Sequence, residues 1–230
     1  THQEKGDLEA AIASYEDSIE LNKNFAFSKA GLIYCKGKAC DWSTEVKTNK
    51  WLRTLGIEDQ AVDPMGLLAS EDEPEKHLIR AKRYIEKKHP GTKSKIYSKP
   101  KEAIHIGYFS ADFRNHPVMQ VILRVIELHD KNKFRIYIYD YGKFMGDDLT
   151  SRLKESECIY RNIRDIDDMH AAKLARSDAL DIAVDLMGYT NGRRFGVFYH
   201  RAAPIQINAL GYPGSSGANC FDYIISDKTI

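Results

Sequence analysis

Apolar residues stand three or four positions apart over residues 8–21 and again over 25–35, and this spacing predicts two amphipathic helices. The polar run Asn22-Lys23-Asn24 lies between them and predicts a turn. Two further helices are expected over residues 41–55 and 77–88. The amino-terminal part of the chain is therefore predicted to be helical.

Asp41 and Asp72 are candidate caps at or shortly before the starts of the third and fourth helices. Residues 62–66 lie between these helices and are expected to form a loop. A stretch rich in Lys, Pro and Ser follows over residues 89–101, and we place a domain boundary there.

After this boundary, short apolar runs alternate with helical patterns. Strands are expected over residues 103–109, 134–141, 180–185, 205–210 and 223–226. Helices are expected over residues 118–128, 147–157, 167–176 and 193–201. This alternation predicts a parallel α/β sheet, in which ligands bind at the carboxyl ends of the strands. The loops that follow the strands are therefore the candidate functional segments.

The composition excludes several classes of protein. The chain has 34 Lys+Arg and 33 Asp+Glu, a net charge of +1, which argues against a strongly basic nucleic-acid binder or a polybasic membrane-surface protein. No apolar run approaches the roughly 20 residues that span a bilayer. Four cysteines are too few for a disulfide scaffold, so we expect a cytoplasmic protein. From the balanced charge and the short apolar runs, we expect it to contact neither nucleic acid nor membrane.

The first helix carries the residues that are typical of the second half of a tetratricopeptide repeat, with Ala11, Tyr15 and Ser18 at the positions that face a paired helix. Any helical hairpin is the alternative, because one repeat is weak evidence. A lone repeat cannot bury its own apolar face, so we expect more repeats before Thr1, in a longer protein. Such an array would present a concave surface to protein partners.

The loop after the first strand, residues 110–117, gathers a hydroxyl, a carboxylate, a guanidinium, an amide and an imidazole before a helix. The free N–H groups of a helix amino terminus suit a phosphate or another anion. His116 is the candidate general base, because imidazole titrates near neutrality, and Asp112 could orient it. The alternative is that Asp112 caps a turn and His116 is only a hydrogen-bonded polar residue beside Pro117.

Two more strand-end loops, residues 187–194 and 210–218, are rich in glycine. Glycine permits positive φ and close approach of the backbone, and Arg193 and Arg194 are expected to open the next helix. A glycine turn with solvated arginines is the alternative. The Gly- and Ser-rich third loop exposes backbone groups that could hold a polar ligand such as a sugar.

Metal binding is not expected. Asp165, Asp167 and Asp168 precede a predicted helix and are expected to cap it rather than to bind a cation. Cys35 and Cys40 lack partners at zinc spacing and are expected to be buried thiols. The glycine patterns that mark triphosphate or dinucleotide binding do not occur.

In order along the chain, the motifs resemble those of the O-linked N-acetylglucosamine transferase family, which includes bacterial members and the plant SPINDLY branch. The match lies in Ile106-Gly107-Tyr108-x-Ser110-x-Asp112-Phe113-x-Asn115-His116-Pro117, Gly188-Tyr189-Thr190, Arg201-x-Ala203-Pro204-Ile205-Gln206, Leu210-Gly211-Tyr212-Pro213-Gly214 and Asp222-Tyr223-Ile224-Ile225, with Cys40-Asp41-Trp42 before them. The residues of the Leu-Gly-Tyr-Pro-Gly and Gly-Tyr-Thr motifs resemble the N-acetylglucosamine branch more closely than SPINDLY itself.

The resemblance implies a GT-B architecture, in which two Rossmann-like lobes face a cleft beside a helical repeat array. It divides the chain into a tetratricopeptide remnant over 1–38, connecting helices and a linker over 39–100, and the amino-terminal catalytic lobe over 101–230. The second lobe would lie beyond Ile230, so we expect this segment alone to be inactive.

The activity implied is inverting transfer of N-acetylglucosamine from UDP-N-acetylglucosamine to Ser or Thr of acceptor proteins, which would bind the repeat surface. No metal or other cofactor is implied. A GDP-fucose donor, as in the SPINDLY branch, and a non-catalytic repeat scaffold are the alternatives.

By the same resemblance, His116 would lie in the cleft as a base or as a substrate-positioning group, with Asp112 nearby. Residues that would contact the substrate are Pro117 against the nucleotide sugar, Leu210, Gly211 and Pro213 around the sugar, and Arg194 as the basic residue after Gly-Tyr-Thr. The chain departs from the family pattern at Asp63-Pro64-Met65-Gly66, Val118 and Asn191.

Overall fold

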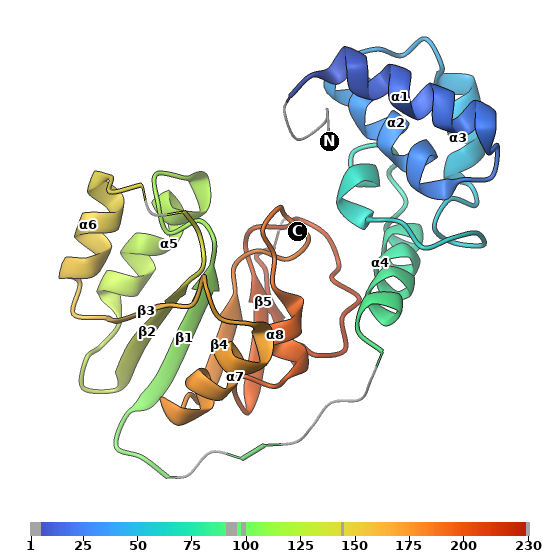
Figure 1. Cartoon of the computed structure of the whole chain (residues 1–230). Coiled ribbons are helices and arrows are strands. Elements are labelled where there is room, and N and C mark those ends of the chain that lie inside the picture. Colours follow the sequence, from blue (N-terminus) through green and yellow to red (C-terminus); the bar gives the residue numbers. More distant parts are fainter. Residues whose placement is uncertain (1–5, 91–95, 98–99, 144, 229–230) are drawn as a thin grey trace. The chain divides into compact units, whose positions relative to one another are not determined.

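The computed structural model describes residues 6–90, 96–97, 100–143 and 145–228 (Figure 1). The chain divides into two compact units: Thr1–Pro90 with Gly214–Ala218, and Gly91–Pro213 with Asn219–Ile230. Part of the predicted linker, residues 91–95 and 98–99, lies outside the described residues.

The first unit is helical, as predicted. Its helices are α1 (Leu8–Leu21), α2 (Ala26–Lys38), α3 (Glu45–Leu52), the 3₁₀ helix η1 (Pro64–Leu67) and α4 (Pro74–Lys88). Within the described ranges of the whole chain, every helix is too short or too polar to cross a membrane.

The predicted caps of α3 and α4 were wrong. Thr44 and Glu73 occupy the cap positions instead of Asp41 and Asp72. The Asp41 carboxylate accepts the N–H of Ser43 at 2.9 Å, which forms a turn and delays the start of α3. The loop expected over residues 62–66 contains the start of η1, because the Asp63 carboxylate accepts the N–H of Met65 and caps a 3₁₀ turn.

Helices α1 and α2 form the predicted close pair. A Cβ atom at Gly31 would lie 2.3 Å from the ring of Tyr15, so only glycine leaves room for that ring between the helices. The hydroxyls of Ser18 and Ser28 meet at 2.7 Å in the same interface. Small residues therefore set the distance between the paired helices.

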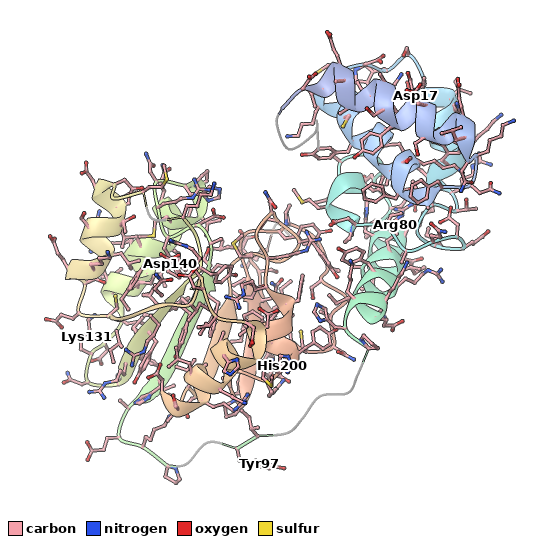
Figure 2. All side chains as sticks on the ribbon, viewed as in Figure 1. Asp17, Arg80, Tyr97, Lys131, Asp140 and His200 are labelled. Carbon is pink, nitrogen blue, oxygen red and sulfur yellow. The ribbon has the colours of Figure 1, made fainter. Side chains whose placement is uncertain are left out.

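A buried arginine fixes the segment between α3 and α4. Arg80, labelled in Figure 2, is fully buried and forms an ion pair with Glu71. Its guanidinium donates to the carbonyl oxygens of Leu52 and Leu55 at 2.6 and 2.7 Å. Leu52 is the last residue of α3 and Leu55 lies in the turn after it, so the arginine satisfies carbonyls that would otherwise be buried without partners.

The second unit is a six-stranded sheet in which every neighbouring pair is parallel, in the order β3-β2-β1-β4-β5-β6. The strands are β1 (Ile104–Ser110), β2 (Phe134–Asp140), β3 (Ile159–Asn162), β4 (Ile182–Asp185), β5 (Ile205–Ala209) and β6 (Tyr223–Ile225). The connecting helices are α5 (Pro117–Leu128), α6 (Asp148–Glu155), α7 (Asp168–Ser177) and α8 (Phe195–Tyr199). The five predicted strands are confirmed, whereas β3 was missed because this short edge strand is half exposed and lacks a continuous apolar run.

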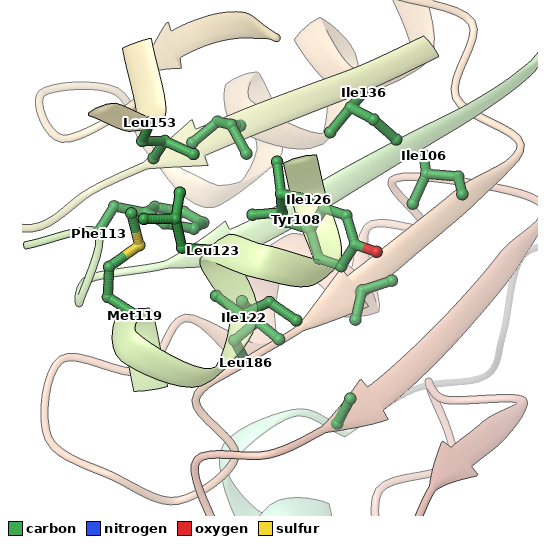
Figure 3. Packing of buried hydrophobic residues seen from close by; sticks show 13 residues of the cluster. Ile106, Tyr108, Phe113, Met119, Ile122, Leu123, Ile126, Ile136, Leu153 and Leu186 are labelled. Carbon is green, nitrogen blue, oxygen red and sulfur yellow. The ribbon is translucent and has the colours of Figure 1, made fainter. Parts of the chain in front are cut away.

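Helices cover both faces of the sheet. On one face, α5 and α6 pack against alternate residues of the strands, among them Ile106, Tyr108 and Ile138, in the cluster drawn in Figure 3. On the other face, the rings of Phe109 and Tyr139 stack with their centroids 4.3 Å apart. Aromatic side chains of β1 and β2 therefore pack against each other on this face.

The strand order places the functional edge of the sheet. From β1 the chain runs outward through β2 to β3, and it then returns to β4 on the other side of β1. Open α/β sheets bind ligands in a crevice at such a reversal, so the carboxyl ends of β1 and β4 mark the expected binding crevice.

The helix pair gives a first testable outcome. Gly31→Ala should lower the free energy of unfolding of the helical unit by roughly 1–3 kcal/mol, because the added methyl group forces the Tyr15 ring from its place. Gly37→Ala is the matched control, since it lies in the same helix with no atom within 4 Å of the added Cβ. Urea unfolding of both variants measures the difference, and equal midpoints would contradict this packing argument.

Candidate functional site

The loops after β1 and β4 meet at the crevice. The hydroxyl of Ser110 donates to the sulfur of Met187 at 3.2 Å, and the N–H of Ala111 approaches the same sulfur at 3.4 Å. The Ser110 hydroxyl also accepts the N–H of Asp112 at 2.9 Å. One buried thioether therefore fixes the start of the β1 loop (residues 111–116) against the β4 loop (residues 186–194).

The β4 loop interlocks with the β5 loop (residues 210–213). Gly188 has φ +54°, and a Cβ there would lie 2.4 Å from the Cβ of Tyr212. Gly211 has φ +61°, and its Cβ would lie 2.2 Å from the carbonyl oxygen of Leu186. The predicted positive φ and close backbone approach are both present, so the three strand-end loops form one connected site.

His116 caps α5. Its Nδ1 accepts the N–H of Val118 at 3.3 Å, which is the bond expected of an N-cap side chain. Because Nδ1 accepts, the proton of the neutral ring lies on Nε2. In this arrangement Nε2 of the imidazole is a hydrogen-bond donor rather than a free lone pair.

Asp112 does not orient that ring by a hydrogen bond. Its carboxylate is buried and accepts from the Arg114 guanidinium at 2.9 Å, whereas its nearer oxygen is 3.7 Å from Nδ1 of His116. The two residues are close enough for electrostatic interaction but do not form an acid–base dyad. This geometry favours a positioning role for His116 over that of a base.

Asp147 holds the β1 loop from α6, a role that the sequence pattern did not indicate. As the N-cap of α6 it accepts the N–H of Thr150 at 2.9 Å, and it also accepts the N–H of Asn115 at 2.6 Å. These backbone hydrogen bonds lower the pKa of the Asp147 carboxyl. The hydroxyl of Thr150 adds a bond to the carbonyl of Phe113 at 3.0 Å.

Arg194 is bound within the fold. Its guanidinium donates to Asp168 at 2.7 Å and to the carbonyls of Ile163 and Ile166 at 2.6 and 2.7 Å, and it lies over the ring of Tyr141. The side chain thus ties the β3–α7 connection to the start of α8. Arg194 is therefore not the solvated arginine of the alternative given in the sequence analysis.

The other residues assigned by resemblance lie at the rims of these loops. Pro117 is the exposed first residue of α5, and Pro213 is exposed at the end of the β5 loop. Leu210 is 41% exposed although its φ is +55°. A leucine is rarely left-handed, so the interlocked β5 loop imposes this conformation.

Asp185 was missed by the sequence analysis because it ends a predicted buried strand. Its carboxylate is 3% exposed and accepts the N–H groups of Met187 and Gly188 and the side-chain amide of Asn208. Burial raises its pKa to about 6, although the three hydrogen bonds oppose this shift.

The remaining candidates are structural. Asp167 caps α7 as predicted, accepting the N–H of His170 at 2.8 Å. The described residues contain no group of three or more His, Cys, Asp or Glu side chains that could hold a metal ion. Cys35 is buried as expected, but the prediction was wrong for Cys40, which is exposed in the turn after α2 with φ +53°.

An open parallel sheet with this strand order, and with its polar loops gathered at the point where the order reverses, defines a doubly wound α/β domain. The model of glycosyl transferase family 41 matches residues 75–230, well over half of the chain. The chain belongs to this family, and the resemblance drawn from the motifs is confirmed.

Named relatives agree with this assignment. A UDP-N-acetylglucosamine–peptide N-acetylglucosaminyltransferase of Caenorhabditis elegans is 34% identical over 127 residues, 55% of this chain and 11% of the relative. The SPINDLY protein of Hordeum vulgare, named as the same kind of transferase, is 35% identical over 54% of this chain and 13% of its own length. The chain thus spans only a small part of each relative.

A solved structure supports the fold. A point mutant of the Thermobaculum terrenum O-GlcNAc transferase aligns with 99% of this chain and 45% of its own, with a TM-score of 0.74 and 23% identity. The predicted Rossmann-like lobe preceded by a helical region is confirmed.

The interlocked loops can be tested by stability. Gly211→Ala should cost at least about 2 kcal/mol, because it adds a collision with the backbone of Leu186 to the strain of positive φ. Gly192→Ala carries positive φ as well, but its Cβ would meet side-chain atoms alone, Ala111 at 3.3 Å and Met187 at 4.0 Å, so it should cost about half as much. Thermal unfolding compares the two, and a Gly211→Ala variant no less stable than Gly192→Ala would contradict the interlock.

Proposed function

We propose that this chain is part of a protein O-glycosyltransferase that moves N-acetylglucosamine from UDP-N-acetylglucosamine to Ser or Thr hydroxyls of proteins. The observation that carries the proposal is the single site formed by the β1, β4 and β5 loops, which bear the family's motifs at the crevice of a family 41 domain. The names of the relatives supply the donor and the peptide acceptor.

In this reaction the acceptor hydroxyl oxygen bonds to the anomeric carbon, the bond from that carbon to the diphosphate breaks, and UDP leaves with the electron pair. The hydroxyl proton passes to a base. His116 would donate through Nε2 to a substrate oxygen and hold it for attack, and the β5 loop residues Leu210, Gly211 and Pro213 would surround the sugar. The start of α5, at Pro117, offers a partial positive charge to the nucleotide sugar.

We further propose that no metal or other cofactor takes part and that acceptor proteins bind the repeat surface of the full-length protein. A cytoplasmic location is supported by the four free cysteines, since disulfides are rare in that compartment. A GDP-fucose donor remains the second candidate, because SPINDLY proteins match at similar identity.

The decisive experiment is sugar transfer by the full-length protein, offered UDP-N-acetylglucosamine, UDP-glucose and GDP-fucose with protein acceptors. His116→Asn keeps an N-cap side chain, so it should unfold like the wild type while losing about 10²-fold in transfer. His116→Ala should lose transfer and also about 1 kcal/mol of stability.

Transfer unaffected in both variants would remove His116 from the site. If the folded wild-type protein neither binds nor uses any of the three donors, the proposed activity is wrong and the alternative of a non-catalytic repeat scaffold is favoured.

A further inference from the structure

Asp185 joins two of the three loops at the site. It ends β4, and its position in the sheet is directly beside Asn208 of β5. One carboxylate oxygen accepts the N–H of Met187 at 3.1 Å. The other accepts the N–H of Gly188 at 3.0 Å and the amide of Asn208 at 2.9 Å.

Each of these three donors belongs to a segment that shapes the site. Met187 and Gly188 form the start of the β4 loop, and the sulfur of Met187 also receives the Ser110 hydroxyl of β1. Asn208 stands two residues before Leu210, where the β5 loop begins. A single buried carboxylate therefore sets the conformation in which the β4 and β5 loops leave the sheet.

We propose that Asp185 is a positioning residue that holds the β4 and β5 loops in the conformation that binds the donor sugar. The proposal rests on the proposed function for the identity of that ligand. Only a carboxylate can accept all three bonds, because a carboxylic acid turns one oxygen into a donor that would face N–H groups. The loops are therefore held by the ionised form.

The surroundings place this ionisation near neutral pH. Burial raises the pKa of Asp185 to about 6, and the hydrogen bonds of Met187, Gly188 and Asn208 limit the rise. The phenol of Tyr141, directly after β2, also interacts electrostatically with this carboxylate, and it stays neutral because burial raises its pKa well above the usual value. Asp112, Asp168 and Arg194 interact with that phenol in turn.

Above pH 6 the carboxylate is ionised and the loops are held, whereas below pH 6 it binds a proton and one acceptor is lost. The dissociation constant of UDP-N-acetylglucosamine for the full-length protein should therefore rise by up to about tenfold per pH unit between pH 6 and 5. Calorimetric titration from pH 5 to 8 measures it.

Two variants separate Asp185 from other acids. Asp185→Asn should weaken donor binding about tenfold at pH 7 and remove the change between pH 6 and 5. Asp140→Asn is the matched control, because Asp140 is also buried, has a raised pKa and ends a strand of the same sheet, β2, but its carboxylate accepts the N–H of Gly142 instead. It should keep the wild-type pH profile, and loss of that profile in Asp140→Asn alone would overturn the proposal.

Hydrogen exchange of the Met187 and Gly188 amides supplies a readout that needs no sugar. In the wild type these amides should open more readily at pH 5 than at pH 7 once the intrinsic pH dependence of exchange is removed. In Asp185→Asn they should be equally open at both. Protected amides in that folded variant would overturn the proposal. If the amides behave as expected but no donor binds, the proposed function fails while the loop anchor stands, so the two failures are distinguishable.

The wild-type measurements also serve where Asp185→Asn does not fold. Exchange that is independent of pH in the wild type, with donor binding equally flat from pH 5 to 8, would overturn the proposal without any variant.

Discussion

Close backbone approach at the carboxyl ends of β1, β4 and β5 is the constraint on which the site depends. Gly188 and Gly211 take positive φ and leave no space for a Cβ, so the β4 and β5 loops fit into each other. The sulfur of Met187 receives two donors from the β1 side of the crevice. Without these contacts the three loops would be separate turns rather than one site.

Polar side chains then fix the loops from behind. Asp147 holds the β1 loop at the start of α6, Arg194 ties the β3–α7 connection to α8, and Asp185 joins the β4 and β5 loops. Each acts on backbone groups or on a neighbouring side chain, and so preorganises the site before a ligand enters it. His116 likewise fixes the start of α5 through Nδ1, which leaves Nε2 as the donor proposed to contact the substrate.

The periodicity of apolar residues and the residues typical of turns predicted most of the helices and strands. Most predicted helices and strands lie within a few residues of the observed ones, because their apolar spacing matches the faces that the two units bury. The exceptions have local causes. Strand β3 is a half-exposed edge strand, and α3 begins later than predicted because the Asp41 carboxylate forms a turn with the N–H of Ser43. The candidate loops followed from strand–helix alternation, since parallel strands place their carboxyl ends along one edge.

The sequence by itself determined the fold class, the strand-end loops and, through the ordered motifs, the family. Only the tertiary structure decided which atoms meet in those loops. Asp112 forms a hydrogen bond with Arg114 and not with His116, and Asp185 accepts hydrogen bonds from both the β4 loop and Asn208 of β5. Such pairings depend on rotamers, burial and contacts between residues far apart in the chain, so local patterns of polarity do not predict them.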